Sequence, residues 1–158
     1  MGFELTVVNN TPLIGEKDPR IVARTLFAQI GYLTPRAADS NVAFGLVYDC
    51  FLLHPDRVWL VEELAGHLKT SGPTVYRHLN RLRGLELLEE VELADRDAED
   101  GKPKKRGPKK RGYRLRYGNL ARAWQFVEAH LKVAAENYAR TVEHLQDLLD
   151  TDPRRTRA

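Results

Sequence analysis

Basic side chains are the most concentrated source of chemistry in this sequence, and many of them lie in one segment. Residues 101–116 hold nine of the 25 Lys and Arg residues and no Asp or Glu. The net charge of the whole chain is +3, so the other residues, with 16 bases against 22 acids, are acidic. A cationic block confined in this way indicates a polyanionic partner, first nucleic acid and second an anionic membrane surface.

A second group of polar side chains lies on one face of a helix predicted over residues 73–83. Pro73 suits the first turn of this helix, and a period of three and four residues separates its two faces. The residues predicted to face the core are Val75, Leu79 and Leu82. The residues predicted on the opposite, polar and cationic face are Thr74, Arg77, Asn80 and Arg81.

Catalytic nucleophiles and metal ligands are sparse. The only serines are Ser40 and Ser71, and there is no glycine-rich phosphate loop. The single cysteine, Cys50, cannot form an intrachain disulfide, lies in an apolar segment where a thiol is inert, and belongs to no zinc-binding spacing. The sequence predicts no enzyme activity, no cofactor and no metal. A metal site on the C-terminal helix would need an antiparallel partner helix to complete a set made of Glu128, His130, His144 and Asp147.

The elements before residue 73 predict a helical core. Residues 1–17 fit a short strand or a loose arm, and Asp18 followed by Pro19 begins a helix that ends near Gly31. The apolar stripe predicted for this helix consists of Val22, Leu26 and Ile30. After a polar linker, the segments predicted are a central buried helix over 42–53, a small strand over 58–60 and a short helix over 61–68.

A hairpin with a long charged tip is predicted after the helix over 73–83. Residues 89–93 and 112–117 alternate as strands do, and the tip over 95–111 is rich in charge, Gly and Pro. The tip repeats PKKRG in tandem, and we expect it to be disordered without a ligand. The acids that precede the block, Glu89 and Glu90 among them, are able to fold back on its cations and lower affinity for a polyanion.

One long helix is predicted from Asn119 to about Leu149. Its apolar stripe is too long for one small domain to cover, so a partner helix is expected, and a homodimer supplies one most simply. The predicted dimerisation residues are Leu120, Trp124, Val127, Leu131, Tyr138, Val142, Leu145 and Leu149. An effector pocket edged by Trp124, Phe126 and Tyr138 is the alternative to packing, and no effector is identified.

The order of these elements and two motifs resemble the winged helix-turn-helix family of DNA-binding transcriptional regulators, of the arsenic-repressor-like, multiple-antibiotic-resistance-like and phenolic-acid-repressor-like (ArsR/MarR/PadR-like) kinds. The motifs are Leu60-Val61-Glu62-Glu63-Leu64-Ala65 and Ser71-Gly72-Pro73-Thr74-Val75-Tyr76-Arg77-His78-Leu79. The resemblance continues through Arg81-Leu82 and Leu85-Glu86-Leu87-Leu88, and it covers about residues 42–118. The chain departs from the family at Glu86, because the family usually has glycine directly before the wing leucine.

The resemblance implies that the helix over 73–83 enters the major groove of double-stranded DNA and that the basic hairpin is a wing. The recognition-helix candidates are Ser71, Thr74, Tyr76, Arg77, Asn80 and Arg81. The wing candidates are Lys102, Lys104, Lys105, Arg106, Lys109, Lys110, Arg111 and Arg114. Three roles stay open for the wing, namely contact with phosphates, base-selective reading of a minor groove, and a solubilising charge run.

The predicted fold class is mainly α with a small β-hairpin wing, a winged helix-turn-helix followed by a long dimerisation helix. The domains predicted are an arm and helix over 1–34, a DNA-binding domain over 40–118 with a long basic wing over 95–112, a dimerisation helix over 119–150 and a disordered tail over 151–158. No secretory leader and no membrane span are recognised, so a cytoplasmic protein is expected.

The predicted function is a sequence-specific transcriptional regulator. Two alternatives stay open: an architectural DNA-binding protein with little sequence preference, and a winged-helix interaction module of a transcription assembly.

Overall fold

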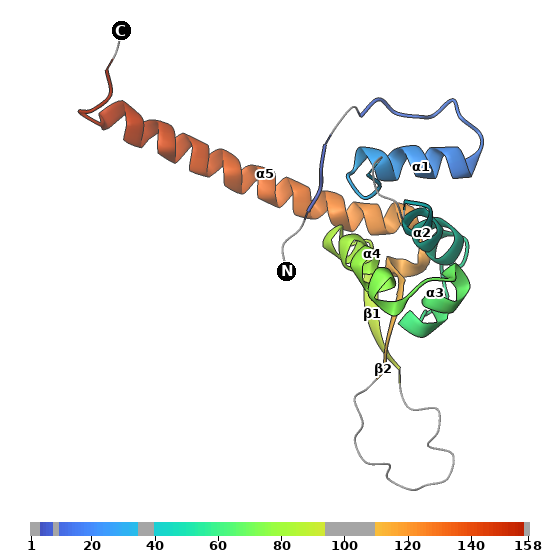
Figure 1. The fold of residues 1–158 in the computed structure, drawn as a ribbon. Helices are drawn as coiled ribbons and strands as arrows, with labels where there is room; N and C mark the ends of the chain where they lie inside the picture. Colours follow the sequence, from blue (N-terminus) through green and yellow to red (C-terminus); the bar gives the residue numbers. More distant parts are fainter. Residues whose placement is uncertain (1–3, 8–9, 35–39, 94–109, 157–158) are drawn as a thin grey trace, which may run out of the picture.

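The computed structural model describes residues 4–7, 10–34, 40–93 and 110–156 of the 158-residue chain. The fold is mainly α with one antiparallel two-stranded hairpin and a long C-terminal helix, in a winged-helix-like arrangement that confirms the predicted fold class. Figure 1 shows helices gathered around the first turns of α5, with the hairpin projecting away on one side. The elements in order are α1 (Pro19–Gln29), α2 (Ser40–Gly45), η1 (Leu46–Leu52), α3 (Val61–Leu68), α4 (Gly72–Gly84), β1 (Leu88–Leu93), β2 (Lys110–Leu115), η3 (Arg116–Gly118) and α5 (Leu120–Thr151).

Helix α1 starts as its sequence predicts, but its buried face is shifted. The Asp18 carboxylate accepts a hydrogen bond from the N–H of Arg20 at 3.0 Å, which caps the helix. Ala23, Phe27 and, as predicted, Ile30 are buried, whereas Val22 and Leu26 are only half-buried. The apolar side is therefore wider than the predicted stripe, because one edge packs on the core and the other lines a groove.

The central segment is buried as predicted, although its second half is a π-helix. Leu46, Cys50 and Phe51 are completely buried. The N–H of Leu53 donates to the carbonyl of Tyr48, five residues earlier, at 3.0 Å. This wider turn is rare and has no signal in the apolar pattern, since a helix that is apolar on most sides is buried in either form.

Helices α3 and α4 meet at the tight turn that the sequence predicts. Lys69 has a left-handed backbone with φ 53°, which ends α3. Ser71 then caps α4, because its hydroxyl oxygen accepts from the N–H of Thr74 at 3.4 Å. Val75, Leu79 and Leu82 are completely buried, so the predicted core face of α4 is confirmed.

The hairpin is fixed to the helices at its base. Strands β1 and β2 pair antiparallel with Leu88 opposite Leu115 and Leu93 opposite Lys110. The segment predicted as a small strand forms a single bridge, in which Trp59 exchanges two hydrogen bonds of 2.8 Å with Tyr113. Strand β2 ends at Leu115, earlier than predicted, because Tyr117 takes a left-handed conformation with φ 60° and turns the chain into α5.

Helix α5 divides into a packed part and a projecting part. Asn119 caps it by accepting from the N–H of Arg122 at 3.0 Å, as predicted. Ala123 and Val127 are completely buried in the core of their own chain, whereas every residue from 135 to 151 is exposed. Figure 1 shows the second half of α5 extending beyond all other elements.

Candidate nucleic-acid interface

The exposed face of α4 carries three of the six residues predicted for the recognition helix. Tyr76, Arg77 and Asn80 are exposed and lie on the side of α4 away from the buried Val75 and Leu79. Arginine and asparagine are the side chains that most often form paired hydrogen bonds with guanine and adenine edges. This face therefore has both the exposure and the chemistry needed to read a DNA groove.

Ser71 and Thr74 have a local structural role at the start of the same helix. Their hydroxyl oxygens lie 2.9 Å apart, within hydrogen-bonding distance, and Ser71 also accepts from the N–H of Thr74. The first backbone N–H groups of a helix attract negative groups such as phosphate. These two residues shape the N-terminus of α4, and their contact with DNA remains a prediction.

Arg81 does not lie on the outward face, so its predicted orientation is wrong. Its guanidinium donates to the carbonyl oxygen of Gly31 at 2.8 Å and lies over the ring of Tyr32, 5.4 Å from the centroid. Gly31 follows the C-terminus of α1, where backbone carbonyls lack partners within the helix. The long Arg81 side chain reaches this acceptor and joins α4 to α1.

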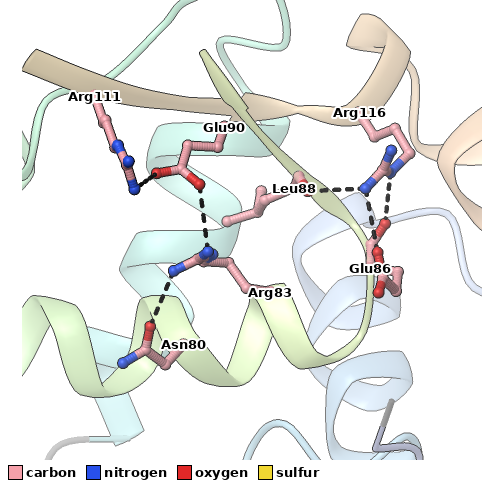
Figure 2. A network of polar contacts seen from close by, with 7 residues as sticks. All are labelled: Asn80, Arg83, Glu86, Leu88, Glu90, Arg111 and Arg116. Carbon is pink, nitrogen blue, oxygen red and sulfur yellow. Dashed lines mark hydrogen bonds and ion pairs between the residues drawn. The ribbon is translucent and has the colours of Figure 1, made fainter. Parts of the chain in front are cut away.

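A polar network joins α4 to both strands of the hairpin, as Figure 2 shows. Glu90 on β1 pairs with Arg83 of α4 at 3.4 Å and with Arg111 of β2 at 3.1 Å. Arg83 also donates to the side-chain oxygen of Asn80 at 3.5 Å. Glu90 thus holds two arginines of different elements beside the exposed face of α4.

The sequence pattern gives Arg83 no contact role. It predicts that Glu90 is able to fold back on the basic block, as its contact with Arg111 shows, but not that Glu90 also joins the block to Arg83. Arg83 falls near the end of α4, between its buried and exposed faces, so periodicity assigns it to neither. Glu90 lies opposite Tyr113 in the strand register and reaches Arg111 diagonally. Only the position of the hairpin relative to α4 brings these three side chains together.

The base of the hairpin places an acidic strand against a basic one. Arg114 donates from Nε to the carboxylate of Glu89 at 2.8 Å, and these two residues are direct cross-strand partners. Three acids on β1, Glu89, Glu90 and Glu92, stand against Lys110, Arg111 and Arg114 on β2. The described base is therefore close to neutral. The other predicted wing residues, Lys102, Lys104, Lys105, Arg106 and Lys109, lie outside the described residues, as does the predicted tip up to residue 109. The last two residues of the predicted tip, Lys110 and Arg111, belong to β2, which corrects the predicted bound of the tip.

The chain enters the hairpin at Glu86, where it lacks the glycine that its resemblance to winged helix-turn-helix proteins implies. Glu86 has a left-handed backbone with φ 62°, a conformation that favours glycine. Arg116 donates to the Glu86 carbonyl at 2.8 Å and pairs with its carboxylate at 3.3 Å. The guanidinium also lies over the Phe126 ring of α5, 4.2 Å from the centroid. Arg116 therefore stabilises the turn that glycine would otherwise make.

The predicted dimerisation residues separate into two groups. Val127 is completely buried in its own chain, and Leu120, Trp124 and Leu131 are half-buried against the same core. Val127 is therefore not available to a partner helix, which corrects the prediction for this residue. The second group is exposed and consists of Tyr138, Val142, Leu145 and Leu149.

Other functional chemistry is limited in the part of the chain that the structure describes. Burial raises the pKa of the Cys50 thiol to about 12, and the nearby Asp49 carboxylate adds to this effect. Cys50 is therefore a protonated, enclosed thiol with no nucleophilic character. No three His, Cys, Asp or Glu side chains of the described segments gather where they could hold a metal ion. None of the described helices is long and apolar enough to span a membrane.

The comparisons with known proteins give little beyond this geometry. No family model matches the sequence, and no curated protein matches it. A solved structure named as a possible transcriptional regulator from Methanosarcina mazei Go1 is similar to the chain, with 22% sequence identity and a TM-score of 0.41. The similarity covers 71% of this chain and 78% of that chain. A likeness this distant carries no argument about function.

Proposed function

We propose that the chain binds double-stranded DNA as a homodimeric, sequence-specific transcriptional regulator. The observation that carries the proposal is the exposed face of α4, where Tyr76, Arg77 and Asn80 stand clear of the core beside the hairpin. A helix of this kind fits the major groove, with its side chains at base edges. The two copies of α4 in a dimer would occupy half-sites one helical turn apart.

The hairpin supplies the phosphate contacts in this proposal. The ion pairs of Glu90 with Arg83 and Arg111 hold its base beside α4. Its tip carries most of the basic block. Phosphate contacts fix the position of a protein on the duplex but carry no sequence information. Neutralising the basic residues of the tip should therefore weaken binding to all sequences alike and reduce its salt dependence.

The first test is a titration of the protein against a pool of genomic duplex fragments and against one random duplex, at two salt concentrations. A preference of at least about 10³-fold that survives the higher salt supports a regulator. A ratio near one, with affinity that falls steeply in salt on both, supports an architectural protein. Absence of duplex binding supports a protein-interaction module.

Arg77→Ala tests the role of α4 directly. We expect this variant to lose about 1–3 kcal/mol of binding free energy on the preferred fragment, with a smaller loss on the random duplex. Arg140→Ala is the matched control, because it removes one exposed arginine from α5, far along the helix from α4. Equal effects of the two variants would show that α4 contributes only charge and would contradict the proposal.

A further inference from the structure

The projecting half of α5 carries a row of exposed apolar side chains. We call Tyr138, Val142, Leu145 and Leu149 the distal stripe. Their side chains are between 40% and 72% exposed. At 3.6 residues per turn they fall on one side of the helix. Large exposed apolar rows of this kind mark interaction surfaces, because water is the least favourable contact for them.

A groove lies beside the packed half of the same helix. It has a volume of about 400 Å³ and runs between the N-terminal residues, α1 and α5. Its walls are largely apolar and include Leu5, Leu13, Val22, Leu26, Trp124 and Leu131. We call it the arm groove. Val22 and Leu26 line it because they occupy the edge of α1 that is not buried in the core.

The arm groove and the distal stripe are parts of one continuous face of α5. Trp124 and Leu131 project from α5 within about 60° of the four distal residues at 3.6 residues per turn. The first two side chains line the groove, and the row then continues onto exposed helix. A helix that covers this face from end to end would contact both surfaces.

We propose that the second copy of the chain provides this helix, with the two α5 helices antiparallel and each distal stripe seated in the partner's arm groove. This arrangement deepens the homodimer of the proposed function and rests on it. Each surface then covers the other, as a two-fold interface requires. The middle of the pair lies near residue 135, halfway between the groove residues and the distal stripe.

Charge favours the antiparallel direction. Residues 120–135 carry two bases and one acid, whereas residues 136–151 carry one base and four acids. Antiparallel helices place the acidic half of one copy beside the more basic half of the other. A parallel pair would instead place the two acidic halves side by side and leave both arm grooves uncovered, and like charges at that separation repel.

The expected spacing of the two DNA-binding units also agrees with antiparallel α5 helices. About 23 residues separate the two copies of Trp124 along an antiparallel pair centred near residue 135, which is about 35 Å at 1.5 Å per residue. Successive turns of the major groove on one side of DNA are about 34–36 Å apart. Figure 1 shows α1 and the hairpin on opposite sides of α5, so a helix seated beside α1 leaves the hairpin side open.

Two pairs of variants test which surfaces meet. Leu145→Glu is expected to weaken dimerisation at least about 100-fold, because each dimer loses two apolar contacts and gains two charges. Its control is Val133→Glu, which changes an exposed valine on the other side of α5. On α1, Val22→Glu changes the arm groove, and Ile21→Glu changes an exposed neighbour outside it. Only Leu145→Glu and Val22→Glu should dissociate the dimer in light scattering, with helical content unchanged in circular dichroism.

Nitroxide labels test the direction of the helices. Cysteines introduced as Glu136→Cys and Asp147→Cys would carry the labels on the side of α5 away from the distal stripe, and the buried Cys50 thiol stays unlabelled. In the proposed dimer the two labels at 147 are displaced along the helix pair by about 35 Å, and those at 136 by about 2 Å. Double electron–electron resonance should therefore give a label-to-label distance at position 147 that is at least about 15 Å longer than the distance at position 136.

Each other outcome overturns the proposal in a recognisable way. Equal distances at the two sites indicate parallel helices, and a dimer that survives Val22→Glu indicates that the arm groove is not part of the interface. A wild-type protein that stays monomeric at tens of micromolar would show that a second copy of the chain does not cover these surfaces. The fragment titration is made on the same samples, so loss of DNA binding with the dimer intact would contradict the proposed function but not this arrangement.

Discussion

Two exposed surfaces of this molecule differ in what they require from a partner. The α4 and hairpin surface is polar, and its charged side chains contact one another through Glu90. The distal stripe of α5 is apolar, with Tyr138 72% exposed. A polar surface is stable in water without a partner, whereas an apolar row gains free energy when it is covered. The first surface therefore suits a reversible contact with DNA, and the second suits a lasting contact with protein.

The largest expected difference between the two surfaces is in the salt dependence of their binding. Raising NaCl from about 50 to 200 mM should lower the affinity for DNA at least about 10³-fold if six or more phosphates are contacted. The dimer should change by less than about threefold, because apolar burial is not screened by salt. Titration on duplex DNA and sedimentation of the free protein measure the two effects on one sample. A dimer that weakens as steeply as DNA binding would show that charge, and not the distal stripe, holds it together.

The two halves of α5 should also respond differently to truncation. Val127→Ala should lower the free energy of unfolding by about 1.5–3 kcal/mol, because a completely buried side chain is lost. Val142→Ala, at an exposed position, should change it by less than about 0.5 kcal/mol. Urea unfolding of both in a monomeric Leu145→Glu background isolates the effect within one chain. Similar losses for the two would mean that the distal half packs on its own domain.

The sequence predicts α3, α4 and α5 well because local signals define them. Asn119 caps α5 as expected, and the period of Val75, Leu79 and Leu82 correctly gives the core face of α4. A cap and a period depend only on neighbours along the chain, so tertiary packing does not change them. They identify which residues share a face, but not what covers that face.

The errors arise where a distant element decides the outcome. Arg81 turns inward because the carbonyl of Gly31, 50 residues away in sequence, is within reach of its side chain. Val127 belongs to the same apolar period as Leu145, yet only Val127 lies where the core reaches. The arm groove depends on the N-terminal residues, whose weak pattern predicts no packing against α5. Contacts of this kind require the fold, and no spacing in the sequence reveals them.

Glu90 gives the smallest expected effect and tests whether the polar surface limits its own affinity. Its carboxylate pairs with Arg83 and Arg111, so Glu90→Gln should release both guanidinium groups toward phosphate. We expect DNA affinity to rise about two- to fivefold, since exposed ion pairs of this kind are worth up to about 1 kcal/mol. Glu143→Gln is the control, because it removes one acid from the exposed half of α5. If Glu90→Gln instead weakened DNA binding, the bridge would hold the hairpin beside α4 in the geometry that DNA requires, and Glu90 would position the arginines without competing for them.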